Sequence, residues 1–234
     1  MEALIKVKNI RKVYQMGEER IIALDDVSLD IQKGEVVCFL GVSGSGKSTF
    51  LNMVAGLEKP TKGEIIIGGI PIHTLNEENV TLFRQKNIGF IFQSYHLLPM
   101  FTAIENVSLP LIFRGVEKKK RDNMASEMLA AVGLAGYENR KPSQMSGGQQ
   151  QRVGIARALV GNPKIIFADE PTGNLDSHTS KEVIEIMMSK VREHNITLIL
   201  VTHDKDVSCY ADRIVTIQDG NILSIENNKI SKGV

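Results

Sequence analysis

The chain has 234 residues, 42% of them apolar, which suits one large domain or a domain with an inserted subdomain. Its 28 Lys and Arg against 27 Asp and Glu give a formal net charge of +1, which gives no support for a nucleic-acid-binding surface. No apolar run approaches the ~18 residues that a membrane helix needs, and four basic residues within 6–12 interrupt any signal-peptide core. We therefore expect a cytoplasmic chain that reaches a membrane only through a partner. Cys38 and Cys209, far apart in the chain, are expected to be buried, reduced thiols.

The first 70 residues predict a small antiparallel β layer. Residues 4–8 alternate apolar and polar as in an edge-type strand, and residues 27–31 do the same, with the apolar side chains on one face. A third short strand is predicted over 64–67 and is closed by Gly68 and Gly69.

Strands and helices then alternate along the chain. The predicted strands run over residues 35–40, 88–92, 164–168, 196–201, 213–217 and 222–225. The predicted helices run over residues 49–55, 76–86, 104–113, 117–132, 147–160 and 177–193. This alternation predicts a mostly parallel sheet covered on its faces. Asp219-Gly220 predicts a hairpin turn, and residues 227–234 are polar and expected to be loose.

Strand signals are absent from 94 to about 160, where helical periodicity replaces them. We interpret residues 94–160 as a helical subdomain inserted between two segments of one core, 1–93 and 161–234.

A glycine-rich segment joins the strand at 35–40 to the helix at 49–55. It consists of Gly41, Val42, Ser43, Gly44, Ser45, Gly46, Lys47, Ser48 and Thr49. The segment fits the phosphate-loop pattern G-x-x-x-x-G-K-S/T, in which glycines tolerate positive φ and let backbone N–H groups approach a triphosphate closely. Lys47 would supply charge to the outer phosphates, and Ser48 a hydroxyl to Mg²⁺. The alternative is a Gly/Ser-rich linker that matches by chance, but the flanking strand and helix argue against it.

An acidic pair ends the predicted strand at 164–168. Asp169 would hold the metal directly or through water, and Glu170 could orient or deprotonate an attacking water. The alternative is an ordinary acidic turn after a strand. The phosphate loop upstream favours the metal site.

A second glycine-rich helix start lies at 145–149, with Ser146 as a good N-cap. Gly147 and Gly148 leave the backbone open, so this is a second candidate anion site, although capped helices after glycine loops are common. Ser146, Gly147, Gly148 and Gln149 are followed by Gln-Gln-Arg-Val and stand between the phosphate loop and the acidic strand end. This arrangement resembles the signature motif of the ATP-binding cassette (ABC) ATPases. Met145 stands where Leu is usual, a swap of similar volume.

The resemblance covers nearly the whole chain and implies a P-loop NTPase fold. That fold has a RecA-like, mostly parallel sheet, an antiparallel β layer and an inserted α-helical subdomain. Gln93 matches the Q-loop glutamine, which joins the metal site to the helical subdomain, and 174–176 matches the D-loop. His203 matches the switch histidine at the γ-phosphate, and Tyr14 the aromatic that stacks on adenine. Otherwise Gln93 is a polar strand end, His203 a core or surface histidine and Tyr14 a packed aromatic.

The same resemblance implies a head-to-tail dimer with two ATP molecules. Each would lie between the phosphate loop of one chain and the signature serine and glycines of the other. Ser48, Gln93 and Asp169 would organise Mg²⁺, with Glu170 acting on water. Implied partners are an integral membrane permease subunit and a second, identical ATPase subunit, at the inner face of the cell membrane. No nucleic acid is expected.

Residues 169–177, and 88–93 followed by Leu-Leu-Pro at 97–99, resemble a narrower group. It contains macrolide-export, lipoprotein-release and cell-division ATPases and peptide-antibiotic resistance transporters. The apolar patch of 97, 98, 100 and 101 is either a groove for a coupling helix of the membrane partner or core packing. The basic run 118–121 is a solvated helix start, or it faces anionic lipid.

Two rival functions make different predictions. A soluble ABC ATPase acting on DNA or ribosomes predicts stimulation by nucleic acid, but such chains usually carry long insertions or tandem cassettes. A phosphate-loop kinase or GTPase would leave the signature motif and His203 unexplained, and an N-K-x-D base reader is not found in the sequence.

Overall fold

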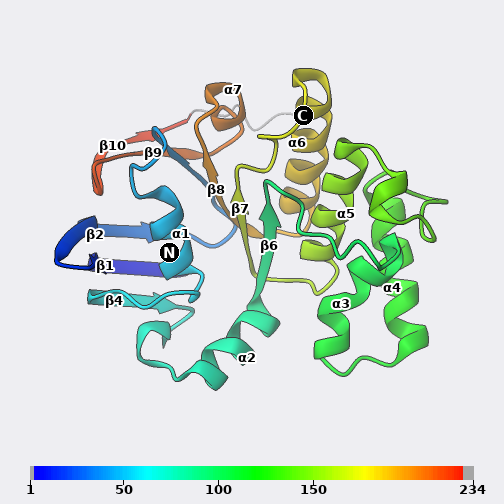
Figure 1. Cartoon of the computed structure of the whole chain (residues 1–234), viewed down its shortest axis with the longest axis horizontal. Helices are drawn as coiled ribbons and strands as arrows, with labels where there is room; N and C mark the ends of the chain where they lie inside the picture. Colours follow the sequence, from blue (N-terminus) through cyan, green and yellow to red (C-terminus); the bar gives the residue numbers. More distant parts are fainter. Residues whose placement is uncertain (1–2, 229–234) are drawn as a thin grey trace. The chain divides into compact units, whose positions relative to one another are not determined.

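The computed structural model describes residues 3–228. The chain divides into two compact units, the first made of 1–81 and 197–234 and the second of 82–196 (Figure 1). The division falls inside helix α2 (Glu77–Asn87). Among residues 3–228, no helix is both long and apolar enough to cross a bilayer.

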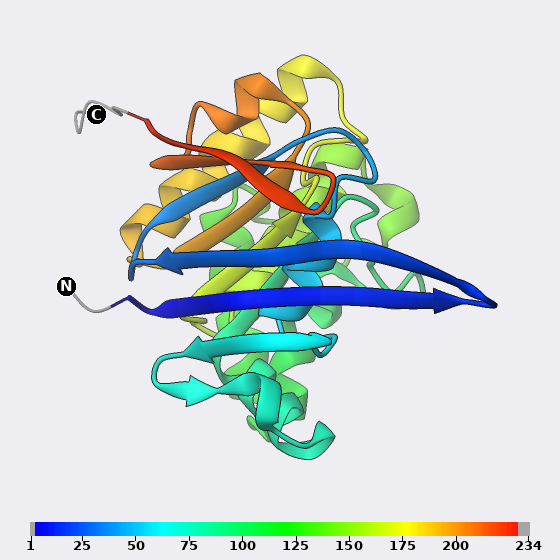
Figure 2. The same cartoon turned by 90° about the vertical axis from the view of Figure 1, so that its left-hand side faces the viewer.

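The first unit contains a four-stranded antiparallel sheet in the order β2-β1-β4-β5. Its strands are β1 (Ile5–Met16), β2 (Glu19–Ile31), β4 (Lys62–Ile67) and β5 (Ile70–Pro71), followed by the 3₁₀ turn η1 (Ile72–Thr74). Figure 2 shows the long β1 and β2 side by side, with β4 along the other side of β1. The predicted antiparallel layer is therefore confirmed.

The prediction of an edge-type strand at residues 4–8 is wrong. Strand β1 lies inside the sheet, because it pairs with β2 on one side and β4 on the other. Its alternation arises because one face is packed and the other solvated, which an interior antiparallel strand also shows. Both long strands also exceed their predicted lengths. Residues 19–22 of β2 are all exposed, so the sequence has no alternation of apolar and polar residues there that would predict a strand. The pairing with β1 nevertheless continues to Met16 opposite Glu19.

The same unit contains β3 (Val36–Leu40), β8 (Thr197–Thr202), β9 (Arg213–Gln218) and β10 (Asn221–Asn227). Strand β3 runs parallel to both β8 and β9, and β10 returns antiparallel to β9. Asp219 and Gly220 turn between them with φ of 48° and 76°, which confirms the predicted hairpin turn. Helix α1 (Lys47–Val54) packs through Phe50 on Phe39 of β3, with ring centroids 4.4 Å apart.

The second unit pairs β6 (Ile88–Phe92) in parallel with β7 (Ile165–Asp169). Its helices are α3 (Ala103–Phe113), α4 (Lys118–Ala131), α5 (Gly147–Leu159) and α6 (Ser177–Glu193), with the 3₁₀ turn η2 (Pro142–Gln144) before α5. Helix α5 contacts β6 and each of the other three helices, so it is the central element of this unit. A Cβ on Gly89 of β6 would lie 2.4 Å from the Ala158 carbonyl oxygen, which explains why a glycine permits this close packing.

The two cysteines differ in burial. Cys38 is buried, which raises its thiol pKa to about 12, but Cys209 is exposed next to the short helix α7 (Lys205–Ser208), contrary to expectation. Asn227 ends β10 and is therefore not loose, while 229–234 lie outside the described residues. The basic run at 118–121 is the first turn of α4, where Lys118 pairs with Asp122 at 2.6 Å, as the solvated-helix interpretation expects.

Candidate functional site

The phosphate loop connects β3 to α1 in the first unit. Gly44 and Gly46 adopt φ of +80° and +105°, as expected. Gly41 does not have a positive φ, so the expectation that glycine is needed there for its backbone conformation is wrong. A Cβ on Gly41 would instead lie 2.4 Å from the carbonyl oxygen of Ile217 in β9, so a glycine is required there by close backbone approach.

The turn between β9 and β10 supports this loop from one side. The Gly220 N–H donates to the Ser45 carbonyl at 3.0 Å, and the Asp25 N–H donates to the Gly220 carbonyl at 2.9 Å. A Cβ on Gly46 would lie 2.6 Å from the Ala23 carbonyl oxygen. The sequence predicted the turn, but its role as a support for the phosphate loop depends on contacts between distant segments.

Lys47 is 6% exposed, and its ammonium group donates to the carbonyl oxygens of Gly41 and Val42 at 2.8 and 2.7 Å. The Ser45 hydroxyl lies at 3.5 Å. All three acceptors are uncharged, so they solvate the buried cation as dipoles and supply no negative charge. An anionic ligand at the loop would supply that negative charge.

Helix α1 begins with Gly46 as its N-cap, and no side chain caps it. Its first backbone N–H groups can therefore donate to a bound anion. The Ser48 hydroxyl is exposed on this first turn, where it could bind a metal ion held by the same anion. The open helix start, the positive-φ glycines and the buried cation fit a magnesium-bound nucleotide phosphate.

Tyr14 is a half-buried residue of β1 with a tethered hydroxyl group. It donates to Glu58 Oε2 at 2.7 Å, and Lys12 Nζ lies 3.1 Å from the same oxygen and 5.0 Å from the centroid of the tyrosine ring. Burial and the bond to Glu58 raise the pKa of Tyr14. Burial alone would raise the pKa of Glu58, but the bonds from Tyr14, Lys12 and Asn52 hold it below its usual value. The ring orientation is thus fixed by a polar network.

His203 follows β8 directly and is exposed, which excludes the interpretation as a core histidine. The next residue, Asp204, accepts from the Asp206 N–H at 2.8 Å and caps α7, while its own N–H donates to the Thr202 hydroxyl at 3.0 Å. These bonds order the backbone on the C-terminal side of the histidine.

In the second unit, Asp169 is the last residue of β7 and Glu170 follows with φ of +47°. A left-handed conformation costs a residue with a Cβ about 1–2 kcal/mol, and a following proline restricts it further. The Gly173 N–H closes the turn by donating to the Glu170 carbonyl at 3.1 Å. Such strain is characteristic of functional sites.

Gln93 and Asn174 hold each other, although 81 residues separate them. The Asn174 amide donates to the Gln93 carbonyl at 3.0 Å, and the Gln93 amide approaches Asn174 Oδ1 at 3.4 Å. A Cβ on Gly173 would lie 2.6 Å from Gln93 Nε2. The sequence indicated both residues but not their pairing.

Ser146 begins α5 with a capping box, as its N-cap role predicted. Its hydroxyl accepts from the Gln149 N–H at 3.3 Å, and Gln149 Oε1 accepts from the Ser146 N–H at 3.0 Å. The hydroxyl proton can still be donated to an anion. A Cβ on Gly147 would lie 2.8 Å from the Tyr95 hydroxyl, and one on Gly148 2.3 Å from Thr179 Cγ2, so a side chain at either position would displace these groups.

Arg157 is a residue that the sequence interpretation missed. It extends from α5 to the carbonyl oxygens of Tyr95 and His96, at 2.7 and 2.5 Å, and burial lowers its pKa. Both carbonyls belong to residues with positive φ, 60° and 47°, just after Gln93. A basic residue on a largely buried helix was the available signal.

The predicted site residues fall into two groups. The first unit carries Tyr14, residues 41–49 and His203; the second carries Gln93, Asp169, Glu170 and residues 146–149. Comparison of the chain with known proteins identifies its family. The family model for ABC transporters matches residues 24–173. The chain belongs to the ABC transporter family.

Relatives of this ABC cassette include the macrolide export ATP-binding/permease protein MacB of Salmonella choleraesuis, 46% identical over 95% of this chain. The chain spans only 34% of the length of that protein. The ABC transporter ATP-binding protein MJ0796 of Methanocaldococcus jannaschii is 47% identical over 94% of this chain and 95% of its own.

Solved structures confirm the P-loop NTPase fold of the cassette. A dimeric, post-hydrolysis structure of MJ0796 bound to ADP and Pi matches with a TM-score of 0.89 and 44% identity, covering 96% of this chain and 99% of that one. CbiO1 of Clostridium perfringens, part of the transporter complex cbiONQ, matches with a TM-score of 0.87 at 28% identity, over 98% of this chain and 90% of that one.

Proposed function

We propose that the chain is the ATP-hydrolysing subunit of a membrane transporter and that it works as a dimer of identical cassettes around two Mg-ATP. The observation that carries the proposal is the pair of glycine-rich helix starts, α1 with no side-chain cap and α5 with Ser146 as its cap, both of which suit an anion. A two-fold dimer lets both act on the same nucleotide. The dimeric structure of MJ0796 with ADP and Pi supports this arrangement.

Each named side chain then has a role that its surroundings support. Lys47 neutralises phosphate charge, and Ser48, Gln93 and Asp169 would hold Mg²⁺, which would shield the negative charge of the phosphates. Glu170 accepts a proton from the attacking water, and His203 contacts the γ-phosphate.

Tyr14 stacks on the base, while Ser146 and the N–H groups of Gly147 and Gly148 bind the γ-phosphate of the nucleotide on the opposite chain. Gln149 holds Ser146 in place through the capping box. Hydrolysis removes these contacts and reopens the dimer.

A complementation experiment tests the shared site. Lys47→Ala disables the phosphate loop, and Ser146→Asp keeps an N-cap residue while it places a carboxylate against the phosphate. Each variant alone is expected to be inactive. In a mixture, the dimer of one chain of each kind has one intact site, so ATP hydrolysis should recover to a fraction set by the mixed dimers.

Ser146→Asn serves as the control for the complementation experiment, because it keeps the cap without the charge and should retain more activity than Ser146→Asp. A site contained within one chain predicts no recovery in any mixture. Absence of recovery, with mixed dimers demonstrated by cross-linking, would contradict the proposal.

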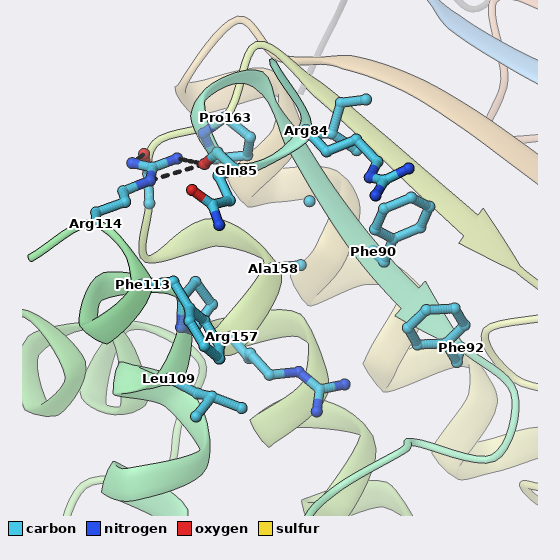
Figure 3. A pocket seen from close by; sticks show the side chains of 14 residues that line it. Arg84, Gln85, Phe90, Phe92, Leu109, Phe113, Arg114, Arg157, Ala158 and Pro163 are labelled. Carbon is cyan, nitrogen blue, oxygen red and sulfur yellow. Dashed lines mark hydrogen bonds between the residues drawn. The ribbon is translucent and has the colours of Figure 1, made fainter. Parts of the chain in front are cut away.

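The membrane partner is proposed to dock at a pocket of about 250 Å³ in the second unit (Figure 3). Phe90 and Phe92 of β6 line one side and Leu109 and Phe113 of α3 another, with Arg157 among the lining residues. This lining suits a partner segment with an apolar face and an acidic side chain. The apolar patch at 97–101 does not line the pocket, and because Leu98 and Met100 are 42% and 77% exposed, core packing does not account for it.

Phe113→Glu tests this docking pocket. Phe113 is 65% exposed, so the substitution should not unfold the helix, but a carboxylate in an apolar anchor position should weaken docking by about 2 kcal/mol or more, roughly 30-fold. The measurement is recovery of a membrane subunit with tagged cassette from detergent-solubilised membranes. Leu223→Glu, at a 66% exposed position of β10, is the matched control. Equal recovery with both variants would count against the pocket.

The finer assignment is that the partner acts in export, lipoprotein release or resistance to macrolides or antimicrobial peptides. Its support is the similarity to the ATP-binding part of MacB together with the subfamily motifs. The cassette would then act at the inner face of the cell membrane, as a peripheral subunit.

A further inference from the structure

Gln151 is the buried polar residue of α5 whose role the proposed mechanism does not use. It is 0% exposed, and its buried neighbours along the helix include Val153, Ile155 and Ala156. A primary amide in such surroundings loses its hydration and is retained only where it makes a specific bond. Within residues 3–228, its Oε1 has no hydrogen-bond partner.

The side-chain amide of Gln151 bonds to the turn that carries Glu170. Its Nε2 donates to the carbonyl oxygen of Pro171, 20 residues away in the chain. Its Oε1 lies beside Gly154, where a Cβ would be 3.5 Å from it. The side chain therefore joins the buried face of α5 to the Pro171 carbonyl.

Pro171 controls the conformation of the residue before it. Its ring excludes much of the backbone space of Glu170, which nevertheless has φ of +47°. The turn is closed internally by the Gly173 N–H to Glu170 carbonyl bond at 3.1 Å, and the Gln151 amide fixes it from the adjacent helix. These two bonds hold the carbonyl groups of consecutive peptide units, so they restrain the backbone of the turn and with it the direction of the Glu170 Cα–Cβ bond.

We propose that Gln151 is a positioning residue for hydrolysis: by holding the Pro171 carbonyl it keeps Glu170 in the left-handed conformation that aims its carboxylate. The inference rests on the proposed role of Glu170 as the group that accepts a proton from water. Gln151 is fully buried and acts through the turn rather than on the reacting atoms.

The test removes the bond to Pro171 in two ways. Gln151→Met fills the same space without a donor, and Gln151→Asn keeps an amide that is one methylene too short to reach Pro171. Both are expected to lower kcat for ATP hydrolysis about 10- to 100-fold, because small misplacements of a catalytic group cost that much, and to leave KM within about twofold. Steady-state hydrolysis provides kcat and KM, and calorimetry checks that the Kd for ATP is also unchanged.

A double variant separates positioning from general stability. If Gln151 acts only through Glu170, Gln151→Met should add no further loss in a Glu170→Gln background, measured as single-turnover hydrolysis of labelled ATP. A purely structural role predicts that the two losses multiply. Asn87→Leu is the control: Asn87 is 9% exposed and its amide also donates to one backbone carbonyl, that of Phe83 at 2.9 Å. It should lower the melting temperature but not kcat.

The outcomes distinguish this inference from the proposed function. A wild-type chain that does not hydrolyse ATP overturns the proposed function and this inference with it. A wild-type chain that hydrolyses ATP, with Glu170→Gln inactive and kcat of both Gln151 variants within twofold of wild type, overturns the positioning role alone.

Discussion

Glu170→Gln is expected to bind ATP normally and to hydrolyse it at least about a hundredfold more slowly, since a general base contributes roughly 10²–10⁴-fold. The amide matches the carboxylate in shape but cannot take a proton from water. Nothing in the turn should change, because the left-handed conformation at 170 and the bond from Gly173 involve the backbone alone. ATP should therefore remain bound, and the two-chain form should accumulate.

The measurements for this variant are phosphate release and gel filtration with and without ATP. Glu185→Gln, an exposed glutamate of α6, is the matched control and should behave like wild type. Turnover of Glu170→Gln within tenfold of wild type would exclude Glu170 as the base. If Glu170→Gln loses turnover as expected but shows no ATP-dependent shift in size, the result would instead argue against ATP-driven closure of the dimer.

Lys47→Ala should weaken ATP binding by about 2–5 kcal/mol, because it removes a buried cation from the phosphate charge. The folded chain should not lose stability in proportion. The Lys47 ammonium bonds to the carbonyls of Gly41 and Val42, so its removal leaves acceptors of the loop unpaired but also relieves the burial of a charge.

Calorimetric titration with ATP and thermal unfolding measure the two effects of Lys47→Ala separately. Lys33→Ala, at an exposed position of the same unit, controls for the loss of one positive charge. An ATP affinity of Lys47→Ala equal to that of Lys33→Ala would show that the loop does not bind phosphate. A large fall in melting temperature would show that Lys47 mainly holds the loop together.

Features that depend on neighbouring residues were predicted from the sequence. The helix after the phosphate loop, the N-cap at Ser146, the turn at Asp219 and the strand that precedes Glu170 all follow from residues within one short segment, although α1 begins at Lys47, two residues before the predicted start, and β7 ends at Asp169, one residue after the predicted end. Helix caps, turns and glycine loops depend on hydrogen bonds between residues a few positions apart, so the residue types in a short segment predict them.

Only the tertiary structure decided which distant residues support these local features. Gly41 is needed because β9 passes close to it, Gln93 is held by Asn174, and Gln151 reaches Pro171 from another element. The two neighbours of β1 were also hidden, since the pattern of a strand reports which face is buried and not how many strands pair with it. Contacts of this kind join residues tens of positions apart, and a single sequence carries no local pattern for them.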